Sequence, residues 1–435
     1  MKKIAVIGSG PMGLVVAYDL LKQGYAVEVF ERDTCVGGMT ASFDLGGIRI
    51  ERFYHFICAT DYPYFALLEE LGIADKLRWR QTKMGFFFHG KLYPWSNPFD
   101  LLRFPHLSLL SKIRYSLHIL AAKNTRSWKK LDTLEATAWL KRWIGNEAYS
   151  VLWESLLRLK YHELRHCISA AWIASRIQRV ARSRKSVFQE KLGYLEGGSE
   201  ILLEALCAAI EKRGGTIRLS QGVQKLLTRQ GEVCGIVTAD GAEEKFDGVI
   251  STAPLPAVQG MAADLSEDER KRIRQIQYIG VICVALKLRS SFTENFWTNI
   301  NDPAIEIPGI VEYTNLYPQT STVLYVPYYL PHTHPRYQLQ DAEILEQTIA
   351  YLKRMRPEFC EAEIESHHVS RYHCAQALCT PHFFGALPPM RTSIRNFLMA
   401  DTSYYYPEDR SISESVKLGH TIAAEFTAYD TRTAA

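Results

Sequence analysis

Apolar positions near the start of the chain switch between the spacing of strands and that of a helix. Residues 3–7 and 26–30 are short apolar runs rich in β-branched side chains, as in buried parallel strands. Between them, apolar residues recur every three or four positions from Leu14 to Leu21, and Gly24 is suited to end a helix. The pattern predicts a strand–helix–strand unit over the first thirty residues.

The rest of the chain alternates between helical and extended patterns. Helical spacing predicts helices at residues 62–71, 201–213, 341–355 and 412–426, and a mostly helical region from residue 107 to about 181. Extended patterns predict strands or hairpins at residues 44–57, 86–93, 216–219, 233–238, 246–251, 281–288, 310–313 and 323–329. This mixture favours an α/β fold, and 435 residues are enough for two domains.

The composition is that of an ordinary globular protein. The chain is 47% hydrophobic and 23% charged, and it has no run of the roughly 18 apolar residues that predicts a membrane-spanning helix. Its nine cysteines form no C-x-x-C pair, which is typical of reduced thiols. The apolar run after Lys3 is too short for an export signal, so we expect a cytoplasmic protein.

The net charge of +4 is concentrated in the helical region. Two stretches without an acidic residue carry the basic side chains Arg103, Lys112, Arg114, Lys123, Arg126, Lys129 and Lys130, and then Arg165, Arg176, Arg179, Arg182, Arg184 and Lys185. Basic amphipathic helices are compatible with peripheral membrane contact through residues 101–131 and 164–189, with phosphate binding, or with solvation alone. We expect no nucleic acid partner, because no binding motif accompanies the charge.

The loop after the first strand gives the first indication of chemistry. Gly8-Ser9-Gly10-Pro11-Met12-Gly13 matches the G-x-G-x-x-G pattern of dinucleotide-binding units. In such a loop, Gly8 permits the turn, Gly10 lets the backbone approach a pyrophosphate, and Gly13 lets the helix pack against the sheet. Glu31, at the end of the second strand, is placed to accept hydrogen bonds from an adenosine ribose.

A second glycine pair follows the acidic residue, in Val36-Gly37-Gly38-Met39-Thr40. The whole opening stretch resembles the FAD-binding start of the flavin amine oxidase superfamily, which includes protoporphyrinogen oxidases, phytoene desaturases and UDP-galactopyranose mutases. The resemblance implies FAD as cofactor and a Rossmann-like FAD-binding domain of glutathione reductase-like topology, next to an α+β substrate domain. It implies an FAD domain made of residues 1–75, 190–255 and 390–435, and a substrate domain made of residues 76–189 and 256–389.

Later segments carry the same resemblance. It implies that Val223, in GGTIRLSQGVQKL, contacts the adenine through its backbone, and that Asp401 binds the ribityl hydroxyls. The helix start at Ser411 and Ile412 would face the flavin ring with free N–H groups. The predicted FAD-contacting residues are Gly8, Gly10, Pro11, Met12, Gly13, Glu31, Arg32, Gly38, Met39, Thr40, Val223, Asp401, Ser411 and Ile412.

The histidine motifs do not lead us to expect a metal site. His162-Glu163-Leu164-Arg165-His166 matches H-E-x-x-H, in which two histidines on one helix face bind zinc. The pattern is short, however, and no downstream ligand is evident. The histidines and cysteines between His332 and Cys379 fit no standard zinc spacing.

Two aromatic segments supply candidate catalytic residues. His55 lies in the run Arg52-Phe53-Tyr54-His55-Phe56, and UDP-galactopyranose mutases have a histidine in a similar stretch close to the flavin. A buried histidine between two domains is the alternative interpretation. Tyr325 belongs to a group of tyrosines between residues 313 and 329, of which strand alternation lets only some face a pocket.

The function implied by the resemblance is that of an FAD-dependent oxidoreductase, which takes a hydride from a hydrophobic substrate, such as an isoprenoid or a cyclic molecule, onto flavin N5. One alternative is a reduced-flavin mutase that rearranges a sugar nucleotide. Another is a non-enzymatic flavin-binding scaffold with membrane or protein partners. We therefore expect a small-molecule substrate, hydrophobic or phosphate-bearing, and a cytoplasmic location that includes the inner face of the membrane.

Overall fold

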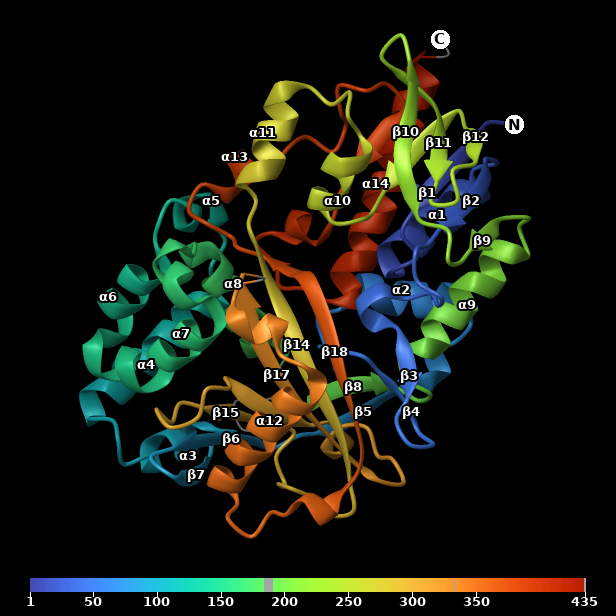
Figure 1. The fold of residues 1–435 in the computed structure, drawn as a ribbon. Coiled ribbons are helices and arrows are strands. Elements are labelled where there is room, and N and C mark those ends of the chain that lie inside the picture. The colour runs from blue at the N-terminus through green and yellow to red at the C-terminus, as the bar shows by residue number, and fades with distance from the viewer. Residues whose placement is uncertain (184–190, 332, 434–435) are drawn as a thin grey trace.

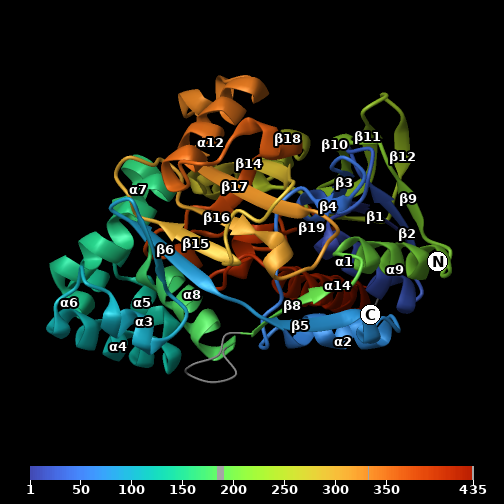
Figure 2. The ribbon, with the colours of Figure 1, turned by 90° about the horizontal axis from the view of Figure 1, so that it is seen from below.

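The chain forms two sheet-based units, with a helical region beside the second (Figures 1 and 2). The computed structural model describes residues 1–183, 191–331 and 333–433. Helices and sheets of both parallel and antiparallel kind are present, which confirms the expected α/β class.

The first unit is a five-stranded parallel sheet in the order β19–β13–β1–β2–β9. Its strands are β1 (Lys3–Ile7), β2 (Ala26–Phe30), β9 (Thr216–Arg218), β13 (Gly248–Ser251) and β19 (Phe397–Met399). Ile4 and Val6 belong to a core with α1 (Pro11–Lys22), α9 (Glu200–Glu211) and α14 (Ile412–Thr433). Ala5 and Ile7 belong to the core on the other face. Because β1 is buried on both faces, its apolar run is continuous.

A small antiparallel sheet packs on that other face. It consists of β10 (Val223–Arg229), β11 (Glu232–Thr238) and β12 (Glu243–Lys245). Leu226, Val233 and Ile236 join Ala5 and Ile7 in one core. β10 has no counterpart among the predicted strands, because its alternation is broken by polar residues and by two register shifts against β11.

The second unit is a seven-stranded sheet in the order β18–β14–β17–β16–β15–β6–β7. Its strands are β6 (Met84–Phe88), β7 (Lys91–Pro94), β14 (Tyr278–Leu288), β15 (Trp297–Ile300), β16 (Gly309–Glu312), β17 (Thr322–Pro331) and β18 (Ile364–Ala377). Neighbouring strands are antiparallel except β15 and β6. Ile282 and Val284 of β14 pack toward α12 (Asp341–Met355), whereas Val281 and Cys283 face the opposite side, in one core with Phe53.

The predicted helical region is confirmed, and it lies between β7 and β8 (Lys191–Leu195) in the chain. It contains α3 (Pro98–Arg103), α4 (Leu109–Lys123), α5 (Trp128–Asp132), α6 (Ala136–Tyr149), a π-helical turn (Ser150–Glu154), α7 (Ser155–Tyr161), a 3₁₀ turn (His162–Cys167) and α8 (Ala170–Ser183). β5 (Leu77–Gln81) pairs antiparallel with β8, so the longer segment that contains β6, β7 and these helices begins and ends at one place.

Shorter elements complete the fold. They are β3 (Ser42–Asp44), β4 (Arg49–Glu51), α2 (Tyr62–Glu70), α10 (Leu255–Met261), α11 (Glu267–Gln275) and α13 (Phe383–Ala386). None of the helices in the described ranges combines the length and the apolar character needed to cross a bilayer. The boundaries that divide the chain into an FAD domain and a substrate domain stay a prediction.

Candidate functional site

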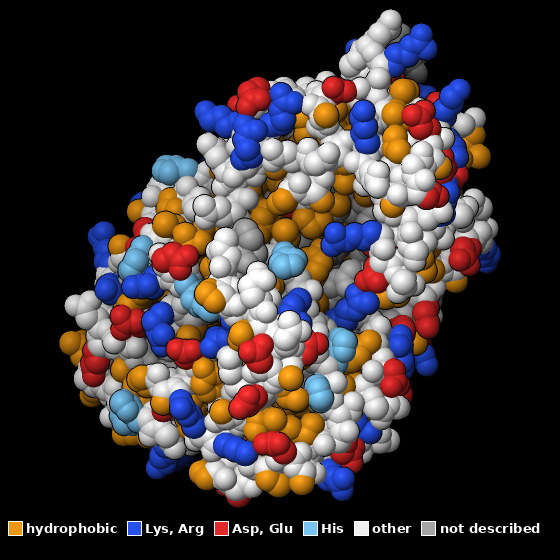
Figure 3. All heavy atoms as spheres, in the orientation of Figure 1, with side chains coloured by type: hydrophobic (Ala, Val, Ile, Leu, Met, Phe, Trp, Pro, Cys, Tyr) orange, Lys and Arg blue, Asp and Glu red, His pale blue; other side chains and the backbone are white. Residues whose placement is uncertain are grey.

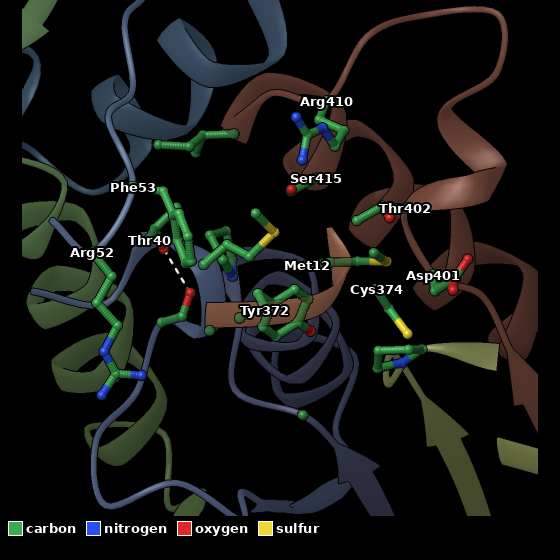
Figure 4. Close-up of a pocket in the computed structure, with 18 of the residues that line it drawn as sticks. Met12, Thr40, Arg52, Phe53, Tyr372, Cys374, Asp401, Thr402, Arg410 and Ser415 are labelled. Carbon is green, nitrogen blue, oxygen red and sulfur yellow. Dashed lines mark hydrogen bonds between the residues drawn. The ribbon is translucent and has the colours of Figure 1, made fainter. Parts of the chain in front are cut away.

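A cavity of about 990 Å³ lies between the two sheet-based units, at the upper end of the ~300–1,000 Å³ typical of ligand sites. Its wall combines the loop after β1, the segment from Glu31 to Ile57, α8, parts of β14, β17 and β18, and the segment that leads into α14. Figure 3 shows the surface hollowed between the upper and lower parts of the molecule, with hydrophobic side chains in the hollow. In Figure 4, Thr40 and Arg52 lie across the cavity from Asp401 and Arg410.

The glycine loop has the close packing that a dinucleotide site needs. Gly8 adopts φ +101°, and a Cβ atom on residue 13 would lie 1.9 Å from the carbonyl oxygen of Gly8. Only glycine fits at either position. A Cβ atom on residue 10 would instead meet nothing closer than 3.9 Å, so Gly10 leaves space on the cavity side.

The first turn of α1 is open to an anion. α1 begins at Pro11 without a side-chain cap and without an acidic residue in its first turn. Its first N–H groups have no partner within the helix, and the positive end of the helix dipole lies with them. Pro11 and Met12 line the cavity, so this turn fits a pyrophosphate.

Glu31 is held in place at the end of β2. Its Oε2 accepts hydrogen bonds from the backbone N–H and the hydroxyl of Ser9, both at 2.8 Å, and its Oε1 accepts one from the N–H of Asp33 at 2.9 Å. Each carboxylate oxygen has more than one lone pair, so a ribose hydroxyl can still donate to it. The predicted role of Glu31 stays a prediction, but its position in the cavity wall is compatible with it.

The structure brings nearly all of the predicted FAD-contacting residues to this cavity. Those that line it are Gly8, Gly10, Pro11, Met12, Glu31, Arg32, Gly38, Met39, Thr40, Val223, Asp401, Ser411 and Ile412. Gly13 does not line it, because it packs against Gly8 beneath the loop. Gly13 therefore supports the loop from beneath, and the predicted direct contact between Gly13 and the cofactor is corrected.

Asp401 is almost completely buried and is already bonded on both oxygens. Its Oδ1 accepts from the N–H and hydroxyl of Ser403, at 2.9 and 2.6 Å. Its Oδ2 accepts from the N–H of Leu255 and the hydroxyl of Tyr278, at 3.0 and 2.5 Å. Asp401 therefore fixes the turn after β19, and a ligand hydroxyl would share a carboxylate that the protein already orients.

His55 is a neutral side chain in the cavity wall. Burial, and then the positive charge of Arg410, lower its pKa to about 4. Its Nδ1 is buried and has no hydrogen-bond partner in the described part of the chain. An unpartnered buried nitrogen next to a cavity is a natural contact for a ligand, so His55 stays a candidate.

The structure does not support Tyr325 as a catalytic residue. Tyr325 is completely buried, does not line the cavity, and donates its hydroxyl proton to the carbonyl of Glu51 at 2.7 Å. Tyr329, on the same face of β17, reaches the cavity instead, and its hydroxyl is 3.0 Å from that of Tyr54. Strand alternation alone assigned both tyrosines to one face and could not tell which one lies at the open end.

Part of the basic helical region is turned inward, which fits the phosphate-binding alternative better than a fully exposed basic face. Arg176 and Arg179 of α8 line the cavity and pair with Asp409 and Asp61, each at 3.2 Å. Burial would raise the pKa of Asp409, but the charge of Arg176 and its basic neighbours lowers it to about 2. The sequence held one signal for this: residues three apart lie on the same face of a helix, so Arg176 and Arg179 can point into one site together. Arg184 and Lys185 lie outside the described residues.

The H-E-x-x-H motif does not lie on one α-helix. His162 has φ +51° and ends α7, and the rest of the motif forms a 3₁₀ turn. The two histidines therefore lack the spacing on a single face that the zinc motif requires. Within the described residues, no group of three or more His, Cys, Asp or Glu side chains could hold a metal ion.

Comparison with known proteins adds to this geometry. The sequence profile of a family described as "Flavin containing amine oxidoreductase" matches residues 13–398. A zeta-carotene desaturase of Synechocystis is 24% identical over 335 residues, or 69% of this chain and 67% of the relative. A mitochondrial protoporphyrinogen oxidase of Nicotiana tabacum is 28% identical over 306 residues, or 60% of this chain and 59% of the relative.

Solved structures share the fold. An oxidoreductase from Methanosarcina mazei matches with a TM-score of 0.75 and 19% identity, over 97% of this chain and 99% of that one. Putrescine oxidase bound to putrescine matches with a TM-score of 0.74 and 17% identity, over 98% and 99% of the two chains. Identities this low carry the fold and no more.

Proposed function

The chain belongs to the flavin-containing amine oxidoreductase family, with FAD as its cofactor, and from this premise we propose that it oxidises a hydrophobic substrate by removing a hydride from carbon. The observation that carries the proposal is one continuous cavity, which runs from the glycine loop to a wall of aromatic side chains. When bound, FAD supplies the hydride acceptor, flavin N5.

The residues present fit FAD. Space beside Gly10 and the uncapped first turn of α1 suit the pyrophosphate. Glu31 would hold the adenosine ribose, and Val223 the adenine through its backbone. The start of α14, at Ser411 and Ile412, would place backbone N–H groups where negative charge develops.

The aromatic wall supplies the surface for the substrate. Tyr54, Phe56, Trp297 and Tyr329 all line the cavity, and the rings of Tyr54 and Trp297 are 5.3 Å apart. Large aromatic side chains exclude water and bind apolar ligands. Two relatives, named as a zeta-carotene desaturase and a protoporphyrinogen oxidase, support a hydrophobic substrate.

A second candidate function is the reduced-flavin mutase acting on a sugar nucleotide. The observation in its favour is the pair of arginines, Arg176 and Arg179, that α8 turns into the cavity that His55 also lines. Guanidinium groups bind phosphates with several donors at once.

We also propose that the protein contacts membranes peripherally, through α3 and α4. The exposed apolar side chains of these helices are Phe99, Leu102, Leu109, Leu110, Ile113, Leu117 and Leu120. Arg103, Lys123, Arg126, Lys129 and Lys130 are exposed nearby. Apolar residues flanked by basic ones suit the interface of an anionic bilayer.

The first experiment is a visible spectrum of the purified protein, followed by anaerobic addition of NADPH. Absence of flavin bands, even after reconstitution with FAD, would overturn the proposed function. Bands that persist with NADPH and bleach on addition of a hydrophobic substrate support the oxidase or dehydrogenase. Bands that bleach with NADPH alone favour the mutase.

A further inference from the structure

Positive charge exceeds negative charge in the wall formed by α8, β17 and the segment before α14. Arg176, Arg179 and Arg410 line the cavity there, together with the carboxylates of Asp61 and Asp409. Two of the arginines pair with these carboxylates. Arg410 has no carboxylate partner among the described residues; its Nη1 donates to the carbonyl of Ala375 at 2.5 Å.

Within the described residues, most N–H donors of the three guanidinium groups have no hydrogen-bond partner and can bind a ligand. Arg179 reaches Asp61 through Nη2 only, and Arg176 reaches Asp409 through Nη1 only. At 3.2 Å, both ion pairs are longer than the ~2.7–2.9 Å of a strong charged hydrogen bond. The Nε of Arg410 is buried and has no partner in the described ranges. A buried cationic donor without a partner is costly, so an anionic ligand fits this wall.

A buried lysine lies beside this wall. The Nζ of Lys160 lies 4.7 Å from the ring centroid of Tyr329 and 5.0 Å from that of Trp172, and the side chain is almost fully buried. Burial, and then the charge of Arg176, lower the pKa of Lys160 well below its usual value. The second of these causes is repulsion between like charges, which a cationic ligand beside Arg176 would also meet.

We propose that Arg410, with Arg176 and Arg179, binds a carboxylate or phosphate group of an anionic substrate whose apolar part lies against Tyr54, Trp297 and Tyr329. The inference rests on the proposed function, since it assigns the substrate class of the same cavity. An amine would meet repulsion from this wall, and an uncharged hydrocarbon would leave the arginine donors without partners.

The test is equilibrium binding to the FAD-loaded protein at constant ionic strength. The probes share one ring and differ in charge: benzoate, phenyl phosphate, benzyl alcohol and benzylamine. Binding is followed by the perturbation of the flavin spectrum and by the shift in Tm. We expect the tighter of the two anions to bind about tenfold or more tightly than benzyl alcohol, and benzylamine to bind most weakly. The tighter anion identifies the group as carboxylate or phosphate.

Arginine variants locate the site. Arg410→Gln should weaken binding of the anion about tenfold and leave benzyl alcohol unchanged, while flavin content and Tm show that the variant is folded. Should it not fold, Arg410→Lys keeps the charge and loses the planar fork, and a severalfold loss is expected. Arg274→Gln, on the exposed side of α11, is the matched control and should change nothing.

Three results would overturn the inference: no anion binding, alcohol or amine binding as tight as that of the anions, or unchanged anion binding in the folded Arg410 variant. Failure of the proposed function is distinguishable, because it removes the flavin bands before any probe is added.

Discussion

Neighbouring glycines of the loop after β1 have different reasons to be glycine. At residue 13 an added Cβ atom would collide with the backbone of Gly8, whereas at residue 10 it would enter the cavity. The first position is constrained by the fold and the second by the ligand. A single motif thus combines two requirements that substitutions can separate.

Gly10→Val should abolish tight FAD binding, by about a hundredfold or more in Kd, because the side chain occupies the space beside the pyrophosphate site. The fold should persist, since Gly10 has an extended φ of −66° that any residue adopts. Isothermal titration with FAD and the Tm of the FAD-free protein check both statements. Gly385→Val, at an exposed position with nothing within 4 Å, is the control. Full FAD retention by Gly10→Val would contradict the site.

His118 offers a test of buried charge. It is completely buried between α4 and α6, with its ring 4.6 Å from that of Trp139, and neither ring nitrogen has a partner in the described ranges. Burial lowers its pKa to about 4. The unfolded chain takes up the proton near pH 6.5 and the folded chain does not, so this contribution to stability is complete above pH 6.5 and is lost as the pH falls toward 4.

His118→Leu should therefore be less sensitive to acid than the unchanged protein. Between pH 7.5 and pH 5, the free energy of unfolding of the unchanged protein should fall by about 2 kcal/mol more than that of the variant. Urea unfolding at the two pH values measures the difference. His367→Leu, at an exposed position, should leave the pH dependence as it is. Equal pH dependence in His118→Leu would show that His118 is protonated in the fold.

The sequence predicted the positions of individual site residues well where the backbone geometry requires a particular residue type. The glycine loop and Glu31 lie where the pattern indicates, because strand, turn and helix follow directly in the chain. Tyr325 does not line the cavity, and the sequence could not show this, because alternation gives the face of a strand and not the depth of the pocket. For Arg176 and Arg179, the sequence left membrane contact, phosphate binding and solvation open, because their carboxylate partners come from segments more than a hundred residues away.

At the scale of elements, α4 has two apolar faces that serve different purposes. One face, with His118 and Ala122, is buried among the other helices. The other carries Leu109, Ile113 and Leu117, which are 65%, 50% and 56% exposed. Packing within the described chain accounts for the first face only, which is why we associate the second with a membrane.

Ile113→Asp with Leu117→Asp should lower partitioning onto vesicles that contain phosphatidylglycerol by about tenfold or more, because two apolar contacts are lost and negative charge is added. Vesicle co-sedimentation measures this, and flavin content should not change. Leu92→Asp with Leu219→Asp, which are exposed elsewhere, is the matched control. Equal losses in both double variants would refute a specific role of α4.

Helices and single strands were predictable, whereas pairing was not. The spacing of apolar residues gave α12 with its observed bounds and most strands of both sheets within a few residues. It gave neither β10 nor the pairing of β5 with β8, because a short polar strand is defined by its partner across the sheet. Strand order in the five-stranded sheet likewise depends on contacts between distant segments.

For the whole molecule, the main consequence of the fold is that one cavity is lined by both sheet-based units. The loop after β1 and Trp297 of the second sheet both line it, so ligands that fill the cavity would contact both units. Binding free energy is then shared between the units, and each depends on the ligand for part of its stability.

Removal of FAD should destabilise both units together. FAD at a hundred times its Kd adds about 2.7 kcal/mol to the free energy of unfolding, which for a chain of this size raises Tm by about 3 °C. Circular dichroism and the fluorescence of Trp297, identified by difference from Trp297→Phe, should shift by the same amount. A Trp297 transition that is independent of FAD would show that bound FAD does not stabilise the second unit.

The pairing of β5 with β8 affects how this fold can change during evolution. Because the segment between β5 and β8 begins and ends at adjacent strands, mutation and recombination can change its helices α3 to α8 while this junction and the sheet strands β6 and β7 keep their geometry. Relatives that share the first sheet-based unit can in this way acquire different helical regions and, with them, different substrates and different locations in the cell.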